Sequence, residues 1–291
     1  MSTPPRKAAR SLGRRVAIAL AHVGLIGAVI VVLYPVMLVC KKAFEPGRQF
    51  ALSASPLPHS FTTAHFRELF SERGAGGELL FLRHTFNSIV VALLTTVVGV
   101  SLSCTAAYAL SRFKFPGRKS GLSMFLVVQM FPATLLLLPL YVILDHLGLL
   151  NSIAGLVLVY STTAIPFCVW TLKGYFDSLP RELEEAARID GASPWMIFRT
   201  IMLPLARPGI AVTALFSFMT AWNEFIMAST FLTDQSRYTL PVLIQSSVTE
   251  FSADWGLFAA GAVVTSLPVM IAFYVLQKYL VGGLTAGAVK G

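Results

Sequence analysis

The sequence predicts an all-α membrane protein that crosses the bilayer with six helices. Of its 291 residues, 55% are hydrophobic and only 13% are charged, and the mean hydropathy is +0.71. A soluble protein of this length needs more charge to cover its surface. Six apolar stretches each reach the ~20 residues that a helix needs to cross the hydrocarbon core. The lysines and arginines are concentrated in alternate gaps between these stretches.

The apolar stretches are expected to be helices because lipid leaves no other partner for backbone polar groups, and no barrel pattern is present. They cover residues 16–40, 85–110, 121–144, 152–172, 208–232 and 256–277. Proline frees a carbonyl and kinks a helix, and Pro132 falls inside the third stretch.

The first stretch follows a basic arm, residues 1–15, as the core of a signal peptide would. A signal-peptide core has only 7–15 residues, and residues 16–40 are a longer run. We therefore expect an uncleaved first membrane helix.

Orientation follows from the excess of basic residues in cytoplasmic loops. Sixteen of the 23 lysines and arginines lie in the arm, the 111–120 link, the 173–207 loop and the C-terminal end, and seven lie on the other side. This distribution predicts that both termini and the 173–207 loop are cytoplasmic. The 41–84 loop is then outside, and we expect it to be irregular with one short helix near 63–72.

No residue pattern points to chemistry in this chain. Cys40, Cys104 and Cys168 lie in apolar runs, and the five histidines are scattered, so we expect no metal site. The chain has no P-loop and no nucleophile–base set, so we expect no catalytic residues and no ATPase activity. The net charge of +9 would suggest nucleic acid for a soluble protein, but its distribution fits membrane topology, so we expect no nucleic-acid partner.

The cytoplasmic segment 177–204, called the elbow below, carries strong local signals. Asp177 or Ser178 can cap a helix that has Pro180 in its first turn. The first turn is acidic, which suits the positive end of a helix dipole. Gly191 can end this helix in the left-handed conformation. Ser193 and Pro194 then look like the start of a second helix running towards Leu203. The acidic residues are Glu182, Glu184 and Glu185.

Two interpretations of the elbow remain open on these signals alone. It is either an amphipathic connector lying on the membrane or an exposed docking surface for a partner protein. For docking, the small side chains of Ala186, Ala187 and Ala192 would let a partner approach closely. The large side chains that could anchor it are Ile189, Trp195, Ile197 and Phe198.

An ionisable residue inside a membrane helix is by default a functional candidate. Glu224 is the main case, about 24 Å along a helix from Pro208 at ~1.5 Å per residue, and so nearer the outer face. It either lines a translocation pathway, with Asn223 and Gln129 as further candidates, or is an interfacial or structural carboxylate.

A sequence motif in the elbow resembles that of a known protein family. The run Glu185-Ala186-Ala187-Arg188-Ile189-Asp190-Gly191, nine residues, and Ile201-Met202-Leu203-Pro204 match E-A-A-x-x-x-G-x(9)-I-x-L-P. This resembles the coupling loop of ABC-importer permeases. The segment 173–176 and Arg207-Pro208 resemble the sugar-importer branch of this family. The tail 283–291 resembles the smaller permease subunit of maltose-type oligosaccharide importers. The resemblance implies the type I importer fold, with one transmembrane domain at 16–281 and a cytoplasmic tail at 282–291.

The resemblance also implies roles for individual residues. The ATPase would be contacted by the elbow, where the coupling residues are Glu185, Ala186, Ala187, Arg188, Asp190, Gly191, Ile201, Leu203 and Pro204. The C-terminal tail would enter the ATPase dimer interface, and the matching residues are Thr285, Gly287, Val289, Lys290 and Gly291.

The implied system is an ATP-driven sugar importer of the bacterial inner membrane. Its other parts would be a second permease subunit, an ATPase homodimer that binds ATP and Mg, and an extracytoplasmic sugar-binding protein, with no cofactor in this chain. Maltose, maltodextrin, trehalose and related oligosaccharides remain open as substrates. The alternative from another class is a secondary transporter driven by an ion gradient. That class usually places several ionisable groups at mid-membrane, whereas here only Glu224 lies well inside a stretch.

Overall fold

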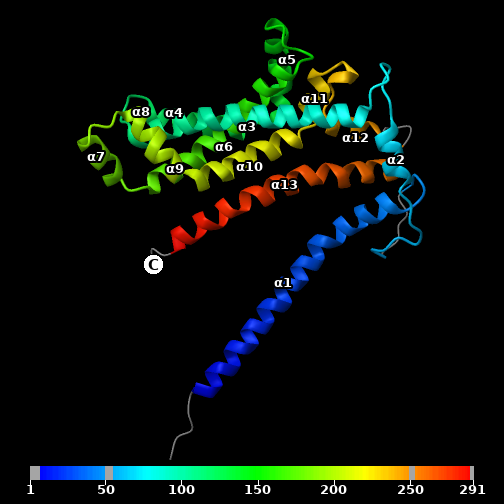
Figure 1. The fold of residues 1–291 in the computed structure, drawn as a ribbon, viewed down its shortest axis with the longest axis horizontal. Coiled ribbons are helices and arrows are strands. Elements are labelled where there is room, and N and C mark those ends of the chain that lie inside the picture. Colours follow the sequence, from blue (N-terminus) through cyan, green and yellow to red (C-terminus); the bar gives the residue numbers. More distant parts are fainter. Residues whose placement is uncertain (1–6, 50–54, 249–252, 289–291) are drawn as a thin grey trace, which may run out of the picture. The chain divides into compact units, whose positions relative to one another are not determined.

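The computed structural model describes residues 7–49, 55–248 and 253–288, and helices dominate it (Figure 1). In these residues the only β-pairings are two isolated bridges, Arg73 with Leu79 and Val248 with Ala253. The all-α prediction is therefore confirmed. The chain divides into two compact units, residues 1–69 with 247–264 and residues 70–246 with 265–291.

The first unit contains α1 (Lys7–Phe44), most of α2 (Ala64–Ser71) and the beginning of α13 (Trp255–Ala288). Its small core joins the end of α1 to α13, where Ala43 packs with Ala259 and Ala260. The short helix expected near 63–72 is present as α2.

The second unit is built on three long helices that lie side by side (Figure 1). They are α3 (Leu80–Arg112), α6 (Ile153–Ser178) and α10 (Arg207–Trp222). Small residues allow close packing between them, as is common for helices in membranes. A Cβ added at Gly209 would stand 2.9 Å from the Tyr175 ring, so α6 and α10 can approach closely there only because this residue is glycine.

Four helices are long and apolar enough to cross a membrane: Arg14–Phe44, Leu80–Arg112, Ile153–Ser178 and Trp255–Tyr279. Two further helix pairs qualify only if each bent pair counts as one span, which brings the number among the described residues to as many as six. The predicted number of membrane helices thus agrees with the upper end of what these residues offer.

The third predicted stretch is one of the bent pairs. It consists of α4 (Arg118–Met130), then η1 (Ala133–Leu136) and α5 (Leu137–His146), with a bend of 97°. The bend lies at Pro132, and Phe131 before it is extended, with ψ 130°. A residue before proline is driven out of the helical region by the proline ring, which explains why the helix stops there.

The fifth predicted stretch, 208–232, is not one continuous helix. α10 ends at Trp222, and α11 (Ile226–Phe231) begins only after Asn223–Phe225. The prediction of an unbroken helix was wrong because two polar side chains bond the local backbone. The Asn223 amide donates to the Met219 carbonyl (2.9 Å), and the Glu224 carboxylate accepts from the first N–H groups of α11.

Polar side chains clamp the remaining connections to the Leu80 end of α3. The segment with η3 (Gln235–Arg237) and α12 (Leu240–Ser246) is held by His84, which lies 2.7 Å from the Gln235 carbonyl, and by Asn87, which donates to the Tyr238 carbonyl (2.9 Å). This end of the unit is therefore rigidly cross-linked, and the elbow lies at the other end of α3.

Candidate docking surface at the elbow

The elbow folds as two short helices joined at a glycine, as predicted. The first is α7 (Glu182–Ile189), and Gly191 follows it with φ +82°. The Ala192 N–H bonds the Ala187 carbonyl (2.9 Å) and the Gly191 N–H bonds the Arg188 carbonyl (3.0 Å). These two bonds make up the Schellman motif, in which a left-handed glycine closes the C-terminus of a helix.

The second helical run starts at α8 (Pro194–Ile197), where the Ser193 hydroxyl accepts from the Met196 N–H (3.2 Å). It continues as a π-helical turn, η2 (Phe198–Met202), and ends with α9 (Leu203–Leu205). The predicted start at Ser193 and Pro194 is thus confirmed. Ile201, Leu203 and Pro204 are half-buried in this run, and their coupling role stays a prediction.

The predicted cap of the first helix was wrong. α6 runs on to Ser178, and Arg181 stands at the N-cap of α7 without a side-chain cap bond. Asp177 is instead engaged by neighbouring helices, because its carboxylate accepts from the Ser111 hydroxyl (2.6 Å) and pairs with Lys173. The acidic first turn of α7 is present as predicted.

One face of the elbow is buried against the ends of α3 and α6. Ala187, Ile197, Phe198 and Met202 share a core cluster with Tyr108 and with α6 residues. The rings of Phe198 and Tyr108 lie 4.9 Å apart. The expectation that Ile197 and Phe198 anchor a partner was therefore wrong, since both side chains hold the elbow to its own helices.

The other face carries large apolar side chains that the chain itself does not cover. Ile189 is 87% exposed and Trp195 is 63% exposed, and Met196 is exposed as well. We call these three the exposed elbow residues. Around them Glu185, Ala186, Arg188 and Asp190 are also exposed. Large apolar side chains with a polar rim are typical of protein-interaction sites, and a tryptophan is a frequent hot spot.

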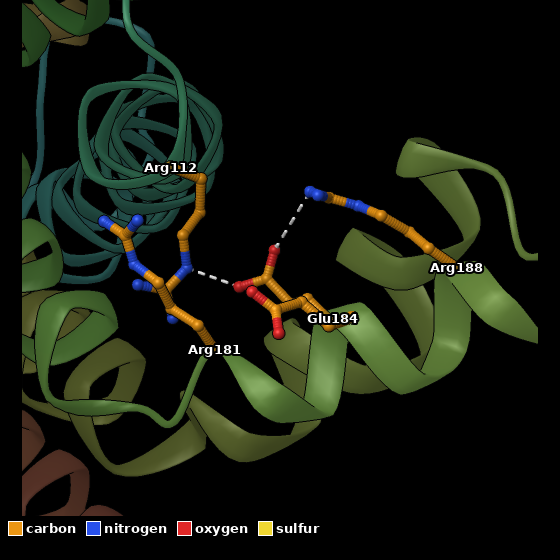
Figure 2. A pocket seen from close by; sticks show the side chains of 5 residues that line it. Arg112, Arg181, Glu184 and Arg188 are labelled. Carbon is orange, nitrogen blue, oxygen red and sulfur yellow. Dashed lines mark hydrogen bonds and ion pairs between the residues drawn. The ribbon is translucent and has the colours of Figure 1, made fainter.

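A cluster of charges lies where α7 meets α3, and Figure 2 shows it lining a small cavity. Glu184 is its centre and is only 3% exposed. Arg112 donates from Nε to Oε1 of Glu184, and the Tyr108 hydroxyl donates to Oε2 (3.0 Å). Arg188, from the far side, reaches within 3.9 Å of Oε2. Arg181 and Glu185 complete the lining.

Sequence reasoning missed this cluster. Glu184 was considered only for the helix dipole, and Arg112 only as one positive charge in a cytoplasmic link. The two residues are 72 positions apart, and neither residue's local pattern signals its partner.

The pathway candidates lie at helix breaks. Gln129 is exposed near the end of α4, and Asn223 is exposed after α10. Glu224 Oε2 accepts from the Tyr160 hydroxyl (2.6 Å) and the Ala228 N–H (3.0 Å), and Oε1 accepts from the Met227 N–H (2.8 Å). These bonds support the structural interpretation of Glu224, and its pathway role stays a prediction.

The tail residues are only partly described. Thr285 and Gly287 belong to the last turns of α13, which continues to Ala288. Val289, Lys290 and Gly291 lie outside the described residues. Across the ranges that the structure describes, no group of three or more His, Cys, Asp or Glu side chains is arranged to hold a metal ion.

Known proteins resemble the chain along most of its length. It is 39% identical over 263 residues to the maltodextrin transport system permease protein MdxG of Bacillus subtilis (strain 168), covering 90% of this chain and 92% of that protein. It is 38% identical over 285 residues to the maltose/maltodextrin transport system permease protein MalG of Escherichia coli (strain K12), covering 94% and 95%.

The fold has a solved counterpart in a bacterial ABC transporter involved in the import of the acidic polysaccharide alginate. That chain matches with a TM-score of 0.72 and 23% identity, covering 96% of this chain and 99% of the other. The family model of the binding-protein-dependent transport system inner membrane component matches residues 99–285, which include the elbow, α6, α10 and the end of α3 that contacts the elbow. The chain therefore belongs to the family of inner membrane components of binding-protein-dependent transport systems, and the alternative of an ion-driven secondary transporter falls away.

Proposed function

We propose that this chain is the smaller permease subunit of an ATP-driven importer of maltodextrins or related oligosaccharides. The coupling of this chain to an ATPase is supported by the two faces of the elbow. Its inner face is buried in the core, and its outer face presents apolar side chains within a polar rim. The sugar class rests on the relatives, which include a galactooligosaccharides transport system permease protein, GanQ, at 40% identity.

The elbow would dock on a separate ATPase homodimer that binds ATP and Mg, because this chain has no P-loop of its own. Coupling requires that ATP binding favour one conformation of the permease over another. An outer face held rigidly on the core is suited to that, since a displacement of the elbow displaces α3 and α6 with it. The tail residues Thr285–Gly291 are proposed as a second contact with the ATPase.

The proposed orientation places the elbow and both termini in the cytoplasm of a bacterial cell and the 41–84 loop outside. The support is the excess of lysine and arginine in the arm, the 111–120 link and the 173–207 loop. Reporter fusions at residues 60 and 240 should report outside, and fusions at residues 115 and 190 inside. One reversed reporter would contradict this topology.

A second permease subunit and an extracytoplasmic sugar-binding protein complete the proposed assembly. In this assembly the second permease subunit would cover part of α4, which is largely apolar and has no buried residue. A solved relative of the fold, a bacterial alginate ABC transporter, was captured in complex with an alginate pentasaccharide-bound periplasmic protein.

Reconstituted uptake tests the proposal directly. The chain, its partner permease and the ATPase are placed in vesicles, and labelled maltodextrin or galactooligosaccharide is offered with the binding protein outside. We expect uptake that needs internal ATP and survives collapse of ion gradients, and competition by unlabelled sugars identifies the substrate. Uptake that is driven by an ion gradient without ATP would refute the proposal.

A further inference from the structure

The exposed elbow residues cannot by themselves transmit a movement to the membrane helices. They face away from the core. The chain joins the elbow to α6 and α10, so a force applied to these residues reaches α3 only through the contacts of the elbow with the end of that helix. Most of these contacts are apolar. The hydrophobic driving force has no direction, so hydrogen bonds and ion pairs at this junction add orientation-specific contacts to the packing.

Arg112 provides directional contacts at this junction. It is the last residue of α3, and its side chain is 4% exposed. Its guanidinium donates to the Glu184 carboxylate, from Nη2 to the Leu179 carbonyl (3.0 Å), and from Nη1 to the Ser111 hydroxyl (3.3 Å). One planar group thus bonds α7, the segment that leads into it, and α3 itself. A planar guanidinium with several donors fixes geometry in a way that a lysine ammonium does not.

The bonds extend to α6 as well. The Ser111 hydroxyl that accepts from Arg112 donates in turn to Asp177 near the end of α6 (2.6 Å). Tyr108, one turn before Arg112 on α3, bonds the second oxygen of Glu184 (3.0 Å). Both oxygens of the buried carboxylate are therefore held by α3, as Figure 2 shows for Arg112.

Burial makes this pair resist separation. Breaking a buried ion pair leaves two charges without partners in a poorly solvated site, which is far more costly than losing an exposed pair. A displacement of α7 that left α3 behind would have to expose or strand both charges. A displacement that carried α3 along would keep every bond.

We propose that the Arg112–Glu184 pair is a positioning link that makes the coupling helix α7 move as one body with α3. The proposal rests on the coupling function proposed above and names the residues that transmit it. Neither residue need touch the ATPase, because both are buried beneath the elbow. The link explains why a short helix on a loop can pass a conformational change to the transmembrane core.

The test compares Arg112→Gln and Glu184→Gln with the control Arg118→Gln, at a half-buried arginine at the start of α4, in the complete transporter. Three quantities are measured: the ATPase retained on purification, the ATP hydrolysed per sugar imported, and the spread of distances between spin labels at Leu102 on α3 and Glu182 on α7. The labelled chain has its three cysteines replaced by alanine. The milder variants Arg112→Lys and Tyr108→Phe keep the charge pair or the ring packing.

We expect both glutamine variants to retain the ATPase, to broaden the distance distribution, and to consume about fivefold or more ATP per sugar. Arg112→Lys should give an intermediate ratio, and Arg118→Gln should match the wild type. An unchanged ratio in both glutamine variants, or a raised ratio without broadening, would overturn the link. If the glutamine variants do not accumulate in the membrane, Arg112→Lys and Tyr108→Phe replace them, and the ATP hydrolysed per sugar and the distance distribution are compared in the same way. If the wild-type chain retains no ATPase, the proposed function is wrong. If the wild type retains it but the distance distribution of the glutamine variants is not broadened, only the proposed link is wrong.

Discussion

The need for the glycine turn of the elbow can be tested at Gly191, where alanine adds one methyl group that contacts no other atom. A Cβ built at this glycine meets no atom within 4 Å, yet the residue has φ +82°. Any effect of Gly191→Ala therefore comes from the backbone conformation and not from a clash. An L-residue in the left-handed region costs about 1–2 kcal/mol, and asparagine tolerates that region better than alanine does.

That cost sets the size of the expected effect. If docking needs the Schellman turn, the apparent affinity falls with the fraction of chains that hold it. A cost of about 1–2 kcal/mol corresponds to about 5–30-fold weaker ATPase binding, since each 1.4 kcal/mol is tenfold. Gly191→Val should weaken binding further, because a β-branched residue is strained there by up to about 3 kcal/mol. Gly191→Asn should lie closest to the wild type.

The assay is titration of the ATPase onto the detergent-solubilised chain, with Gly174→Ala as the matched control. Gly174 is also exposed with no atom within 4 Å of a built Cβ, but it lies inside α6 with no positive φ. Alanine there favours the helix by about 1 kcal/mol, so binding should not change. Equal affinity for Gly191→Ala, Gly191→Val and the wild type would show that the glycine turn is not required for docking and that the elbow is a passive connector.

Three further predictions follow from single contacts. Trp195→Ala should weaken ATPase binding without lowering the thermal stability of the chain. Phe198→Ala should cost about 3–5 kcal/mol of stability because its ring is in the core. Lost stability for Trp195→Ala, with normal stability but weak binding for Phe198→Ala, would show that Phe198 is the docking residue and Trp195 the core residue. Glu224→Gln should lower the thermal stability in detergent, since hydrogen bonds to a charged group contribute about 1.5–3 kcal/mol. The double variant with Tyr160→Phe should lose less stability than the sum of the two single losses, because the two side chains share one bond. Normal stability of Glu224→Gln with lost transport would instead support the pathway role. Asn151→Gly should allow the same φ of +53° but remove the two bonds that the Asn151 Oδ1 accepts from the Thr233 and Asp234 N–H groups. Hydrogen exchange at these two amides should therefore speed up, and unchanged exchange would show that the two bonds do not protect them.

Features that depend on residues close in sequence were predictable. The first, second, fourth and sixth apolar stretches form continuous helices, as a local rule predicts. The glycine end of α7, its acidic first turn and the start of α8 at Ser193 also follow from local rules and are present. The short helix α2 in the 41–84 loop was also found where it was expected. Local rules need only the side chain and the backbone within one or two turns, and a single sequence contains both.

Features that depend on tertiary contacts were not predictable. The elbow sequence offers four large side chains as partner anchors, but only packing decides that Ile197 and Phe198 turn inward while Ile189 and Trp195 stay exposed. Asp177 looks like a helix cap until Ser111 and Lys173 claim its carboxylate. Glu224 looks like an unpaired charge within a long helix until the Tyr160 hydroxyl, on α6, donates to its carboxylate.

The length of α7 shows why the two faces of the elbow depend on each other. An isolated helix of eight residues is not stable in water, because nucleation is unfavourable and few bonds follow it. α7 is a helix because Glu184 and Ala187, three residues apart on one face, are held by the ends of α3 and α6. The exposed residues Glu185, Ala186 and Ile189 occupy the rest of the same turns. The surface offered to a partner therefore exists only while the buried face as a whole is anchored. Loss of the apolar contacts of Ala187 and its core cluster would abolish docking, whereas loss of the ion pair alone would leave docking in place and impair only transmission.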